Sequence, residues 1–390
     1  MNNIQNLQEG KYILWGAATS AYSGKLRAYL IKKDIDYIEL HPSHPHFKTV
    51  VLPKIGHFTL PVLETPEGDI VADSTEAIEF LEERYPERPA LPDDKVMAAL
   101  AQLIHSYGSE GLHKPMMYFR WASTHANRCY VINEFSRGIF QKEDRSPEAV
   151  EEFSNQFRGY LYPLGVRNNH SVDRVIEASS YILYDILNEH FLEYPYLLGG
   201  LPSMADYGLL MGLHPHQGRD PFTSGDLKLR APALYRWMET MHRKAIIDPE
   251  VYHVPQAFFT PKQIPQTLKN LLTLIFADYG TEVLATASAY HDWLMAEDRQ
   301  AGTIISHDCQ KANHQALGEI SHMQQGVEIK RIAFLDNLTH HQRLVKVIES
   351  MDETARKTFQ TLMSETGGKE VANLRLERPM VRDNFAYVVK

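Results

Sequence analysis

In the N-terminal part of the chain, apolar positions change from a continuous run to helical spacing and back. The run Tyr12–Leu14 predicts a buried strand. Apolar residues then recur at helical spacing, which predicts a helix over about Ala21–Lys33. Asp36–Leu40 predicts a second strand, and the short connections favour parallel pairing of the two strands. The helical spacing places three cationic residues outside or at the edges of the helix: Lys25, Arg27 and Lys32.

The next segment has the signature of a β-hairpin followed by a capped helix. Thr59–Glu64 and Ile70–Ala72 are extended in pattern and are joined by a turn that contains proline and glycine. Asp73 or Ser74 then caps a helix that ends before a pair of prolines. This order of elements predicts a complete α/β domain over residues 1–92.

Strand signals fade after Asp93, and helical ones dominate up to about Lys244. An apolar stripe over Val175–Leu187 and an apolar run capped by Ser203 both predict buried helices. We therefore expect an all-helical domain over residues 93–250.

The last part of the chain, residues 251–390, carries no recognisable motif. The pattern predicts one amphipathic helix over Leu268–Tyr279, continued to Leu294, and another over Leu344–Leu362. Two further segments predict strands: Gly326–Phe334 and Asn384–Val389. We therefore expect a mixed, mostly helical C-terminal extension, whose role the pattern does not indicate.

Composition and charge limit the expected partners. The chain has 390 residues, of which 44% are hydrophobic and 23% charged, as in an ordinary globular protein. Its 40 basic and 49 acidic residues give a formal charge of −9, and no basic block is present. Nucleic acids and anionic membranes attract basic patches, so we expect neither as a partner. Small molecules and proteins remain.

The cysteine count and the terminal segment indicate a compartment. Cys129 and Cys309 are too far apart for a CxxC motif and too few for a disulfide framework. The N-terminus lacks the cationic and apolar segments of a secretion signal. The longest strongly apolar stretch, Leu271–Ala277, is far too short to span a bilayer. These features favour a cytoplasmic protein.

Five segments resemble the glutathione transferase family, in the family's order: Ser20–Arg27, Leu60–Leu63, Asp73–Ile78, Ser203–Asp206 and Ala231–Trp237. Their order is more specific than any one of them, and the resemblance covers roughly residues 11–250. It implies an α/β thioredoxin-like domain followed by an all-α helical domain. It also implies a glutathione site on the first domain, a second-substrate pocket between the two, and a homodimer. The extension is more than such an enzyme needs.

The resemblance implies that a hydroxyl at the start of the first helix stabilises the glutathione thiolate. The positive end of a helix favours an anion, and Ser20 stands at that end. Thr19, Tyr22 and Ser23 are rivals, because one residue of register decides which hydroxyl reaches the sulfur. Ser20 can equally be a plain helix cap. Some members of the family use a cysteine here, and both cysteines of this chain lie elsewhere, which disfavours a mixed disulfide.

The resemblance also assigns residues to the peptide part of glutathione. In the family, a cis-proline at Pro61, after Leu60, lets Val62 offer its backbone N–H and C=O to the cysteinyl unit. Ser74 and the N–H groups that open its helix would hold the γ-glutamyl carboxylate, unless Ser74 is only a cap. Asp73 would contact the amino group, although the family more often has glutamate there.

Two assignments stay open: the cation for the glycyl carboxylate, and the residues that line the second-substrate pocket. Lys54 and His57 are both candidates for the cation that binds the glycyl carboxylate, since they lie in the loop before the proline. The first helix of the helical domain is expected to line the second-substrate pocket, although the same residues suit an ordinary core: His105, Tyr107, His113, Met116, Met117, Tyr118, Arg120 and Trp121. The histidines form no cluster with recognisable metal-ligand spacing, so we expect no metal.

The sequence therefore supports two hypotheses of different classes. The first is a glutathione-dependent transferase that directs the thiolate at an electrophilic carbon of an apolar or aromatic compound. The second is a non-catalytic scaffold with the same fold, in which the extension carries the function. A glutathione-dependent peroxidase or thiol reductase is disfavoured, because no cysteine lies at the first helix.

Overall fold

A computed structural model of the chain describes residues 9–122, 125–136, 159–166, 169–306, 317–383 and 386–390, together with single positions between 136 and 159. Four strands form the first sheet: β1 (Tyr12–Trp15), β2 (Tyr37–Leu40), β3 (Val62–Glu64) and β4 (Ile70–Ala72). Their order is β2-β1-β3-β4, with β1 and β2 parallel and the other pairs antiparallel. The predicted parallel pair and the predicted hairpin are both confirmed.

Both faces of this sheet are covered. Helices α2 (Ala21–Lys33) and α4 (Ser74–Arg84) cover one face, and Leu14 of β1 packs there. The other face, which carries Ile13 and Trp15, packs on the turn η1 (Phe47–Val51) and on α3 (Leu52–Ile55). Successive residues of a strand point to opposite faces, which explains this division. The thioredoxin-like α/β domain is thus as predicted.

Helices dominate the described part of residues 93–250. They are α5 (Lys95–Ser106), α6 (His113–Ala122), α7 (His125–Phe135), α9 (His170–Glu193), α10 (Met204–Leu213), α11 (Pro221–Arg230) and α12 (Pro232–Thr240). Short turns join several of them: η2 (Tyr107–Gly111), η4 (Gly159–Leu161) and η5 (His214–Gly218). Helix α10 starts with the predicted capping box, in which the Ser203 N–H donates to Asp206 at 2.9 Å.

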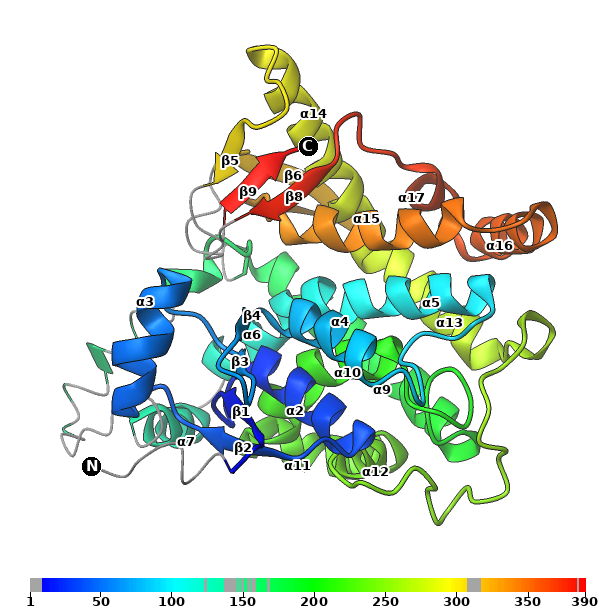
Figure 1. Cartoon of the computed structure of the whole chain (residues 1–390). Helices are drawn as coiled ribbons and strands as arrows, with labels where there is room; N and C mark the ends of the chain where they lie inside the picture. Colours follow the sequence, from blue (N-terminus) through cyan, green and yellow to red (C-terminus); the bar gives the residue numbers. More distant parts are fainter. Residues whose placement is uncertain are drawn as a thin grey trace.

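The C-terminal extension is mixed, as predicted (Figure 1). Its helices are α13 (Gln266–Ile275), α14 (Thr281–Ala296), α15 (Asp336–Glu349), α16 (Glu353–Thr366) and α17 (Lys369–Asn373), with the turns η6 (Pro261–Gln263) and η7 (Phe276–Gly280). Its strands are β5 (Ile304–Ser306), β6 (Glu319–Gln324), β7 (Val327–Ile332), β8 (Met380–Asp383) and β9 (Ala386–Val389). Strands β5, β9 and β8 form one antiparallel sheet, and β6 and β7 form a hairpin.

The extension shares a hydrophobic core with the rest of the chain. Helix α15 lies along α5 (Figure 1), and Leu344 of α15 and Leu362 of α16 belong to the same buried cluster as Leu100 of α5. Helix α5 packs on α10 on another side, and each of its residues from Val96 to Ser106 is buried. The extension is therefore packed as an integral layer rather than attached by a linker.

Two cations predicted at the surface of the first helix are buried instead. Lys25 is 0% exposed and Lys32 is 2% exposed. The Lys32 ammonium donates to the Tyr196 hydroxyl at 2.9 Å and to the Ala245 carbonyl at 2.7 Å. Helix α10 packs against α2, so the second domain covers a face that local spacing assigns to solvent.

The helix predicted over Leu344–Leu362 is two helices, so this prediction is wrong in its extent. Helix α15 ends at Glu349 and α16 begins at Glu353. Asp352 caps α16, because its carboxylate accepts from the Ala355 N–H at 2.8 Å. The apolar spacing continues through Met351 across the break, and for this reason the pattern alone does not reveal it.

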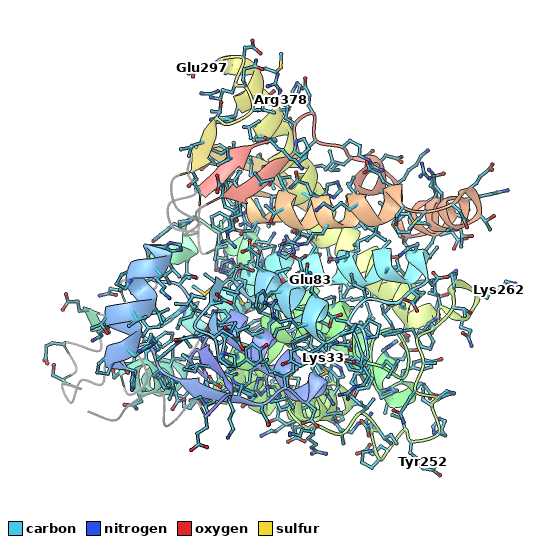
Figure 2. All side chains as sticks on the ribbon, in the orientation of Figure 1. Lys33, Glu83, Tyr252, Lys262, Glu297 and Arg378 are labelled. Atoms are coloured by element: carbon cyan, nitrogen blue, oxygen red, sulfur yellow. The ribbon has the colours of Figure 1, made fainter. Side chains whose placement is uncertain are left out.

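No helix within the described residues combines the length and the hydropathy needed to cross a membrane. Side chains at the edge of the molecule include Tyr252, Lys262 and Glu297 (Figure 2).

The division into domains at residues 92 and 250 stays a prediction, since the shared hydrophobic core includes residues on both sides of each point.

Candidate functional site

A cavity of about 380 Å³ opens where the sheet, the helical region and the extension meet. Six of the predicted site residues line it: Ser20, Tyr22, Leu60, Pro61, Asp73 and Ser74. The extension contributes four more lining residues: Phe334, Asp336, His340 and Arg382. Segments far apart in the chain thus converge on one space.

The loop that leads into α2 is held at three consecutive carbonyl groups. Arginines donate to each of them: Arg27 to Ala17 at 3.2 Å, Arg219 to Ala18 at 3.3 Å and Arg120 to Thr19 at 2.8 Å. Arg120 is fully buried and is itself fixed by a two-pronged ion pair with Asp220, at 2.9 Å on both oxygens. This arrangement fixes the backbone directly before Ser20.

Ser20 is the N-cap of α2, with extended backbone angles (φ −83°, ψ 123°). Its hydroxyl oxygen accepts from the Ser23 N–H at 3.2 Å. A hydroxyl that accepts through its oxygen still has a proton to donate. The cap and the predicted thiolate contact are therefore compatible rather than alternative roles.

The rival hydroxyls occupy different positions. Ser23 is 0% exposed, does not line the cavity, and its hydroxyl accepts from the Ala17 N–H at 3.4 Å. The Tyr22 hydroxyl donates to the Glu110 carboxylate at 3.3 Å, and burial, together with Glu110, raises the pKa of Tyr22 well above its usual value. Thr19 is buried at the cavity wall. Ser20, at the helix start, and Tyr22 are both partly exposed residues, but the Tyr22 hydroxyl already donates to Glu110.

The proline loop has the predicted cis bond between Leu60 and Pro61. Both residues line the cavity, and Leu60 lies outside the strands. Val62 does not line the cavity; it lies in β3, in register with Trp15 of β1 on one side and Ala72 of β4 on the other. Its backbone groups therefore face neighbouring strands, and the predicted backbone contact of Val62 with a ligand does not fit this geometry.

Neither candidate for the glycyl carboxylate lines the cavity. Lys54, on α3, is exposed, and its ammonium donates to the Gly68 carbonyl at 3.2 Å. His57 is partly buried and directly precedes Phe58 and Thr59, which do line the cavity. His57 is thus closer along the chain to the cavity than Lys54.

Asp73 and Ser74 form the start of α4. Asp73 is the N-cap, with φ 81°, a conformation that is uncommon for residues with a side chain and recurs at binding sites. Its carboxylate accepts from the N–H groups of Thr75 (2.7 Å) and Glu76 (3.4 Å). Burial by itself raises the pKa of Asp73, but the Arg382 and Lys25 cations hold this pKa well below its usual range.

Ser74 is 1% exposed, and its hydroxyl faces the cavity wall without a hydrogen-bond partner among the described residues. Buried hydroxyls are nearly always hydrogen-bonded, so this one is available to a water molecule or a ligand. The prediction that several helix N–H groups would bind the anion here needs correction, because Asp73 already accepts from two of them.

Comparison with protein families matches residues 14–89 to the family described as glutathione S-transferase, N-terminal domain. The chain carries a glutathione S-transferase N-terminal domain. Solved structures that resemble the chain include the beta-etherase LigF from Sphingobium, with 19% identity and a TM-score of 0.42 over 62% of this chain and 98% of that one.

Two other similar structures are glutathione transferases. One, from Phanerochaete chrysosporium, has 18% identity and a TM-score of 0.41 over 61% of this chain and 98% of that one. The other, from Methylobacterium radiotolerans in complex with glutathione sulfonate, has 20% identity and a TM-score of 0.34 over 64% of this chain and 97% of that one. Comparison with curated proteins gives no match.

Many of the residues that the helical region and the extension contribute to the cavity are apolar. They include Met116, Met117, Trp121, Phe135, Leu164 and Phe334. Helix α6, and not the first helix α5, provides the predicted part of this lining, and three predicted residues do not line the cavity: His105, Tyr107 and Tyr118. His113 and Arg120 do line the cavity.

Beside the cavity lies a buried polar cluster that the sequence pattern did not reveal. The Lys25 ammonium donates to the hydroxyls of Thr75 (2.7 Å) and Ser109 (3.5 Å), and burial lowers the pKa of Lys25 to about 8. The rings of His105 and His340 pack edge to face at 4.8 Å, and burial lowers both pKa values well below the usual value. Both histidines are therefore neutral at pH 7.

The described residues contain no group of three or more histidine, cysteine, aspartate or glutamate side chains placed to hold a metal. Arg382, Asp336 and His340 were missed as site residues because the sequence near them carries no motif. Only the packing of the extension brings them to the cavity.

Proposed function

We propose that the chain is a glutathione-dependent transferase that stabilises the glutathione thiolate through Ser20. The observation that supports this most directly is the Ser20 hydroxyl at the start of α2, on the cavity that also contains cis-Pro61 and Ser74. The positive end of α2 favours an anion at the same place. Reduced glutathione and an apolar or aromatic electrophile are the proposed substrates.

In this proposal, the Ser20 hydroxyl donates to the sulfur while its oxygen accepts from the Ser23 N–H. The cation of Arg120 holds the Thr19 carbonyl and so keeps the hydroxyl in position. The thiolate attacks an electrophilic carbon on the apolar side of the cavity, where Trp121 and Phe334 exclude water. Conjugation, dehalogenation, ether cleavage and isomerisation share this step, and we leave the subtype open.

The remaining parts of glutathione are assigned by position. We propose the backbone of Leu60, in place of Val62, for the cysteinyl unit, because Leu60 lines the cavity outside the strands. Asp73 faces the γ-glutamyl amino group and Ser74 the γ-glutamyl carboxylate. Lys54 and His57 stay the candidates for the glycyl carboxylate.

The thiol pKa of bound glutathione tests the role of Ser20. A hydrogen bond to a charged group is worth about 1.5–3 kcal/mol, so Ser20→Ala should raise this pKa by roughly one to two units. Turnover with a generic electrophile at pH 6.5 should fall by about tenfold to a hundredfold and recover at high pH. Ser20→Thr keeps the hydroxyl and should retain most activity.

Tyr22→Phe is the matched control, since it removes a rival hydroxyl from the same cavity. A thiol pKa that moves with Tyr22→Phe and not with Ser20→Ala assigns the sulfur contact to Tyr22. Failure of the full chain to bind immobilised glutathione would instead support the scaffold hypothesis.

Localisation and assembly stay proposals as well. We propose a cytoplasmic protein, on the cysteine usage described above. We also propose a homodimer. Helix α5 lies between α10 and α15, and its residues from Val96 to Ser106 are buried, so the contact between the two subunits would use other elements. Sedimentation of the full chain determines the assembly.

A further inference from the structure

The γ-glutamyl end of glutathione carries an ammonium and a carboxylate side by side. A site for it needs an anion for the first group and donors for the second. Asp73 supplies the anion, but its carboxylate already accepts from the N–H groups of Thr75 and Glu76. Of the three donors that open α4, this cap leaves only the N–H of Ser74, beside the unpartnered Ser74 hydroxyl. These two neutral donors would hold a carboxylate close to the negative charge of Asp73.

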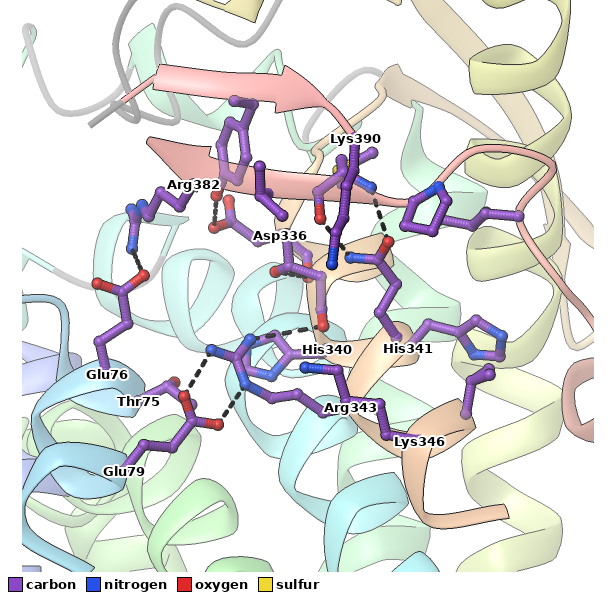
Figure 3. A pocket seen from close by; sticks show the side chains of 18 of the residues that line it. Thr75, Glu76, Glu79, Asp336, His340, His341, Arg343, Lys346, Arg382 and Lys390 are labelled. Atoms are coloured by element: carbon purple, nitrogen blue, oxygen red, sulfur yellow. Dashed lines mark hydrogen bonds and ion pairs between the residues drawn. The ribbon is translucent and has the colours of Figure 1, made fainter. Parts of the chain in front are cut away.

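Arg382, which belongs to the extension, places a cation beside the Asp73 carboxylate. Its guanidinium Nη1 lies 3.1 Å from the Asp73 carboxylate and 3.5 Å from that of Glu76. The residue lines the same cavity as Ser20, Pro61 and Ser74. It also lines a neighbouring cavity of about 760 Å³ between α4, α15 and β8, where Figure 3 shows its contact with Glu76. The guanidinium therefore lies in the wall between the two cavities.

The fold of the extension holds Arg382 in this position. Arg382 on β8 is in register with Tyr387 on β9, and its guanidinium carbon lies 5.6 Å from the centre of the Tyr387 ring. The Tyr387 hydroxyl donates to Asp336 at 2.5 Å, at the start of α15. Farther along α15, Arg343 makes a separate contact with α4, since it donates to both oxygens of Glu79, at 2.6 and 3.1 Å (Figure 3). The cation is thus placed before a ligand arrives.

We propose that Arg382 binds the γ-glutamyl carboxylate of glutathione together with Ser74, so that the C-terminal extension completes the glutathione site. This inference rests on the proposed function. A guanidinium matches a carboxylate with two parallel donors, which neither Ser74 nor the helix end provides alone. The Asp73 carboxylate then remains to bind the γ-glutamyl ammonium. The extension is in this way a part of the substrate site rather than an addition to a complete enzyme.

The test is the binding of two ligands to the full chain, measured by titration calorimetry. One ligand is glutathione, and the other is 4-aminobutyryl-cysteinylglycine, which lacks only the γ-glutamyl carboxylate. Arg382→Gln should weaken glutathione binding by at least tenfold and leave binding of the analogue unchanged within twofold. Arg382→Lys, which keeps the charge, should bind glutathione more tightly than Arg382→Gln.

Arg343→Gln is the matched control. It removes an arginine that also joins the extension to α4 but lies outside the glutathione cavity. Glutathione binding should be unchanged in this variant. Two results would show that these arginines only dock the extension, and either would overturn the inference. One is an equal loss of affinity for both ligands in Arg382→Gln. The other is a loss of glutathione affinity in Arg343→Gln as large as that in Arg382→Gln. Unchanged glutathione binding in Arg382→Gln would overturn it as well. Wild-type chain that binds neither ligand would refute the proposed function itself, which is a separate result.

Discussion

The buried carboxylate of Glu282 links the extension to the helical region, and its removal gives a sharp prediction. Glu282 on α14 is 0% exposed and faces two cations that are each 1% exposed. Its oxygens accept from the Lys114 ammonium of α6 at 2.8 Å and from the Arg331 guanidinium of β7 at 2.5 Å. Asn337 donates to it as well, at 3.0 Å. The Arg331 guanidinium in turn lies 4.7 Å from the centre of the Phe334 ring, and Phe334 lines the cavity that also contains Ser20.

The substitution Glu282→Gln removes the charge with little change of shape. An amide keeps one acceptor oxygen and turns the other into an N–H₂ donor, so at least one cation then faces a donor. Breaking a buried ion pair by removing one partner costs about 3–5 kcal/mol, because a charge is left buried without compensation. Domains are stable by only about 5–15 kcal/mol, so the free energy of unfolding in urea should fall by a large part of its value.

The pH dependence of the free energy of unfolding tests the same ion pairs in a second way. Burial by itself raises the pKa of Glu282, but Arg331 and Lys114 hold this pKa well below its usual value near 4.3. The folded state thus favours the ionised form, and the stabilisation is present above that value and is lost as the pH falls below it. The difference in stability between the wild-type chain and Glu282→Gln should therefore narrow in acid.

Two comparisons make the result decisive. Asp292→Asn removes an exposed acid from the same helix and should change stability by less than about 0.5 kcal/mol. The triple variant Lys114→Met, Glu282→Leu and Arg331→Met replaces the charges by apolar groups and should be more stable than Glu282→Gln alone. Unfolding of Glu282→Gln at the same urea concentration as Asp292→Asn would contradict this prediction, and so would a triple variant that is the least stable of the four proteins.

Two glycines and a buried lysine give further predictions. A Cβ at Gly108 would lie 2.3 Å from the Gly208 backbone, so Gly108→Ala should cost about 3 kcal/mol or more in a urea titration. Gly225, exposed in α11, has no atom within 4 Å of the place that a Cβ would take, and Gly225→Ala should add roughly 0.5–1 kcal/mol; equal effects of the two changes would contradict this. The lowered pKa of Lys25, about 8 against about 10.4 unfolded, means that the unfolded state binds the proton more tightly. The stability of the wild-type chain relative to Lys25→Met should rise by about 3 kcal/mol between pH 7 and pH 10.5, and a flat difference would rule this out.

Much of the N-terminal domain could be predicted because its signals are local. Helix α2 has the predicted bounds, and β4 does as well. The Ser203 capping box needs only residues three apart in the chain, and the hairpin needs only a short turn. The cis bond before Pro61 and the place of Ser74 on the cavity could be predicted for the same reason, since each lies within a short segment that resembles the family.

The sequence by itself therefore determined most of the elements and their order, and it pointed to Ser20, Pro61 and Ser74, which line one cavity. Only the tertiary structure decided that Lys25 is buried, that Val62 lies between two strands, and that Arg382 reaches Asp73. These outcomes depend on contacts between segments far apart in the chain, and neither periodicity nor spacing along the chain carries that information. Arg382 and Asp73 meet because a shared core packs the extension against the first domain.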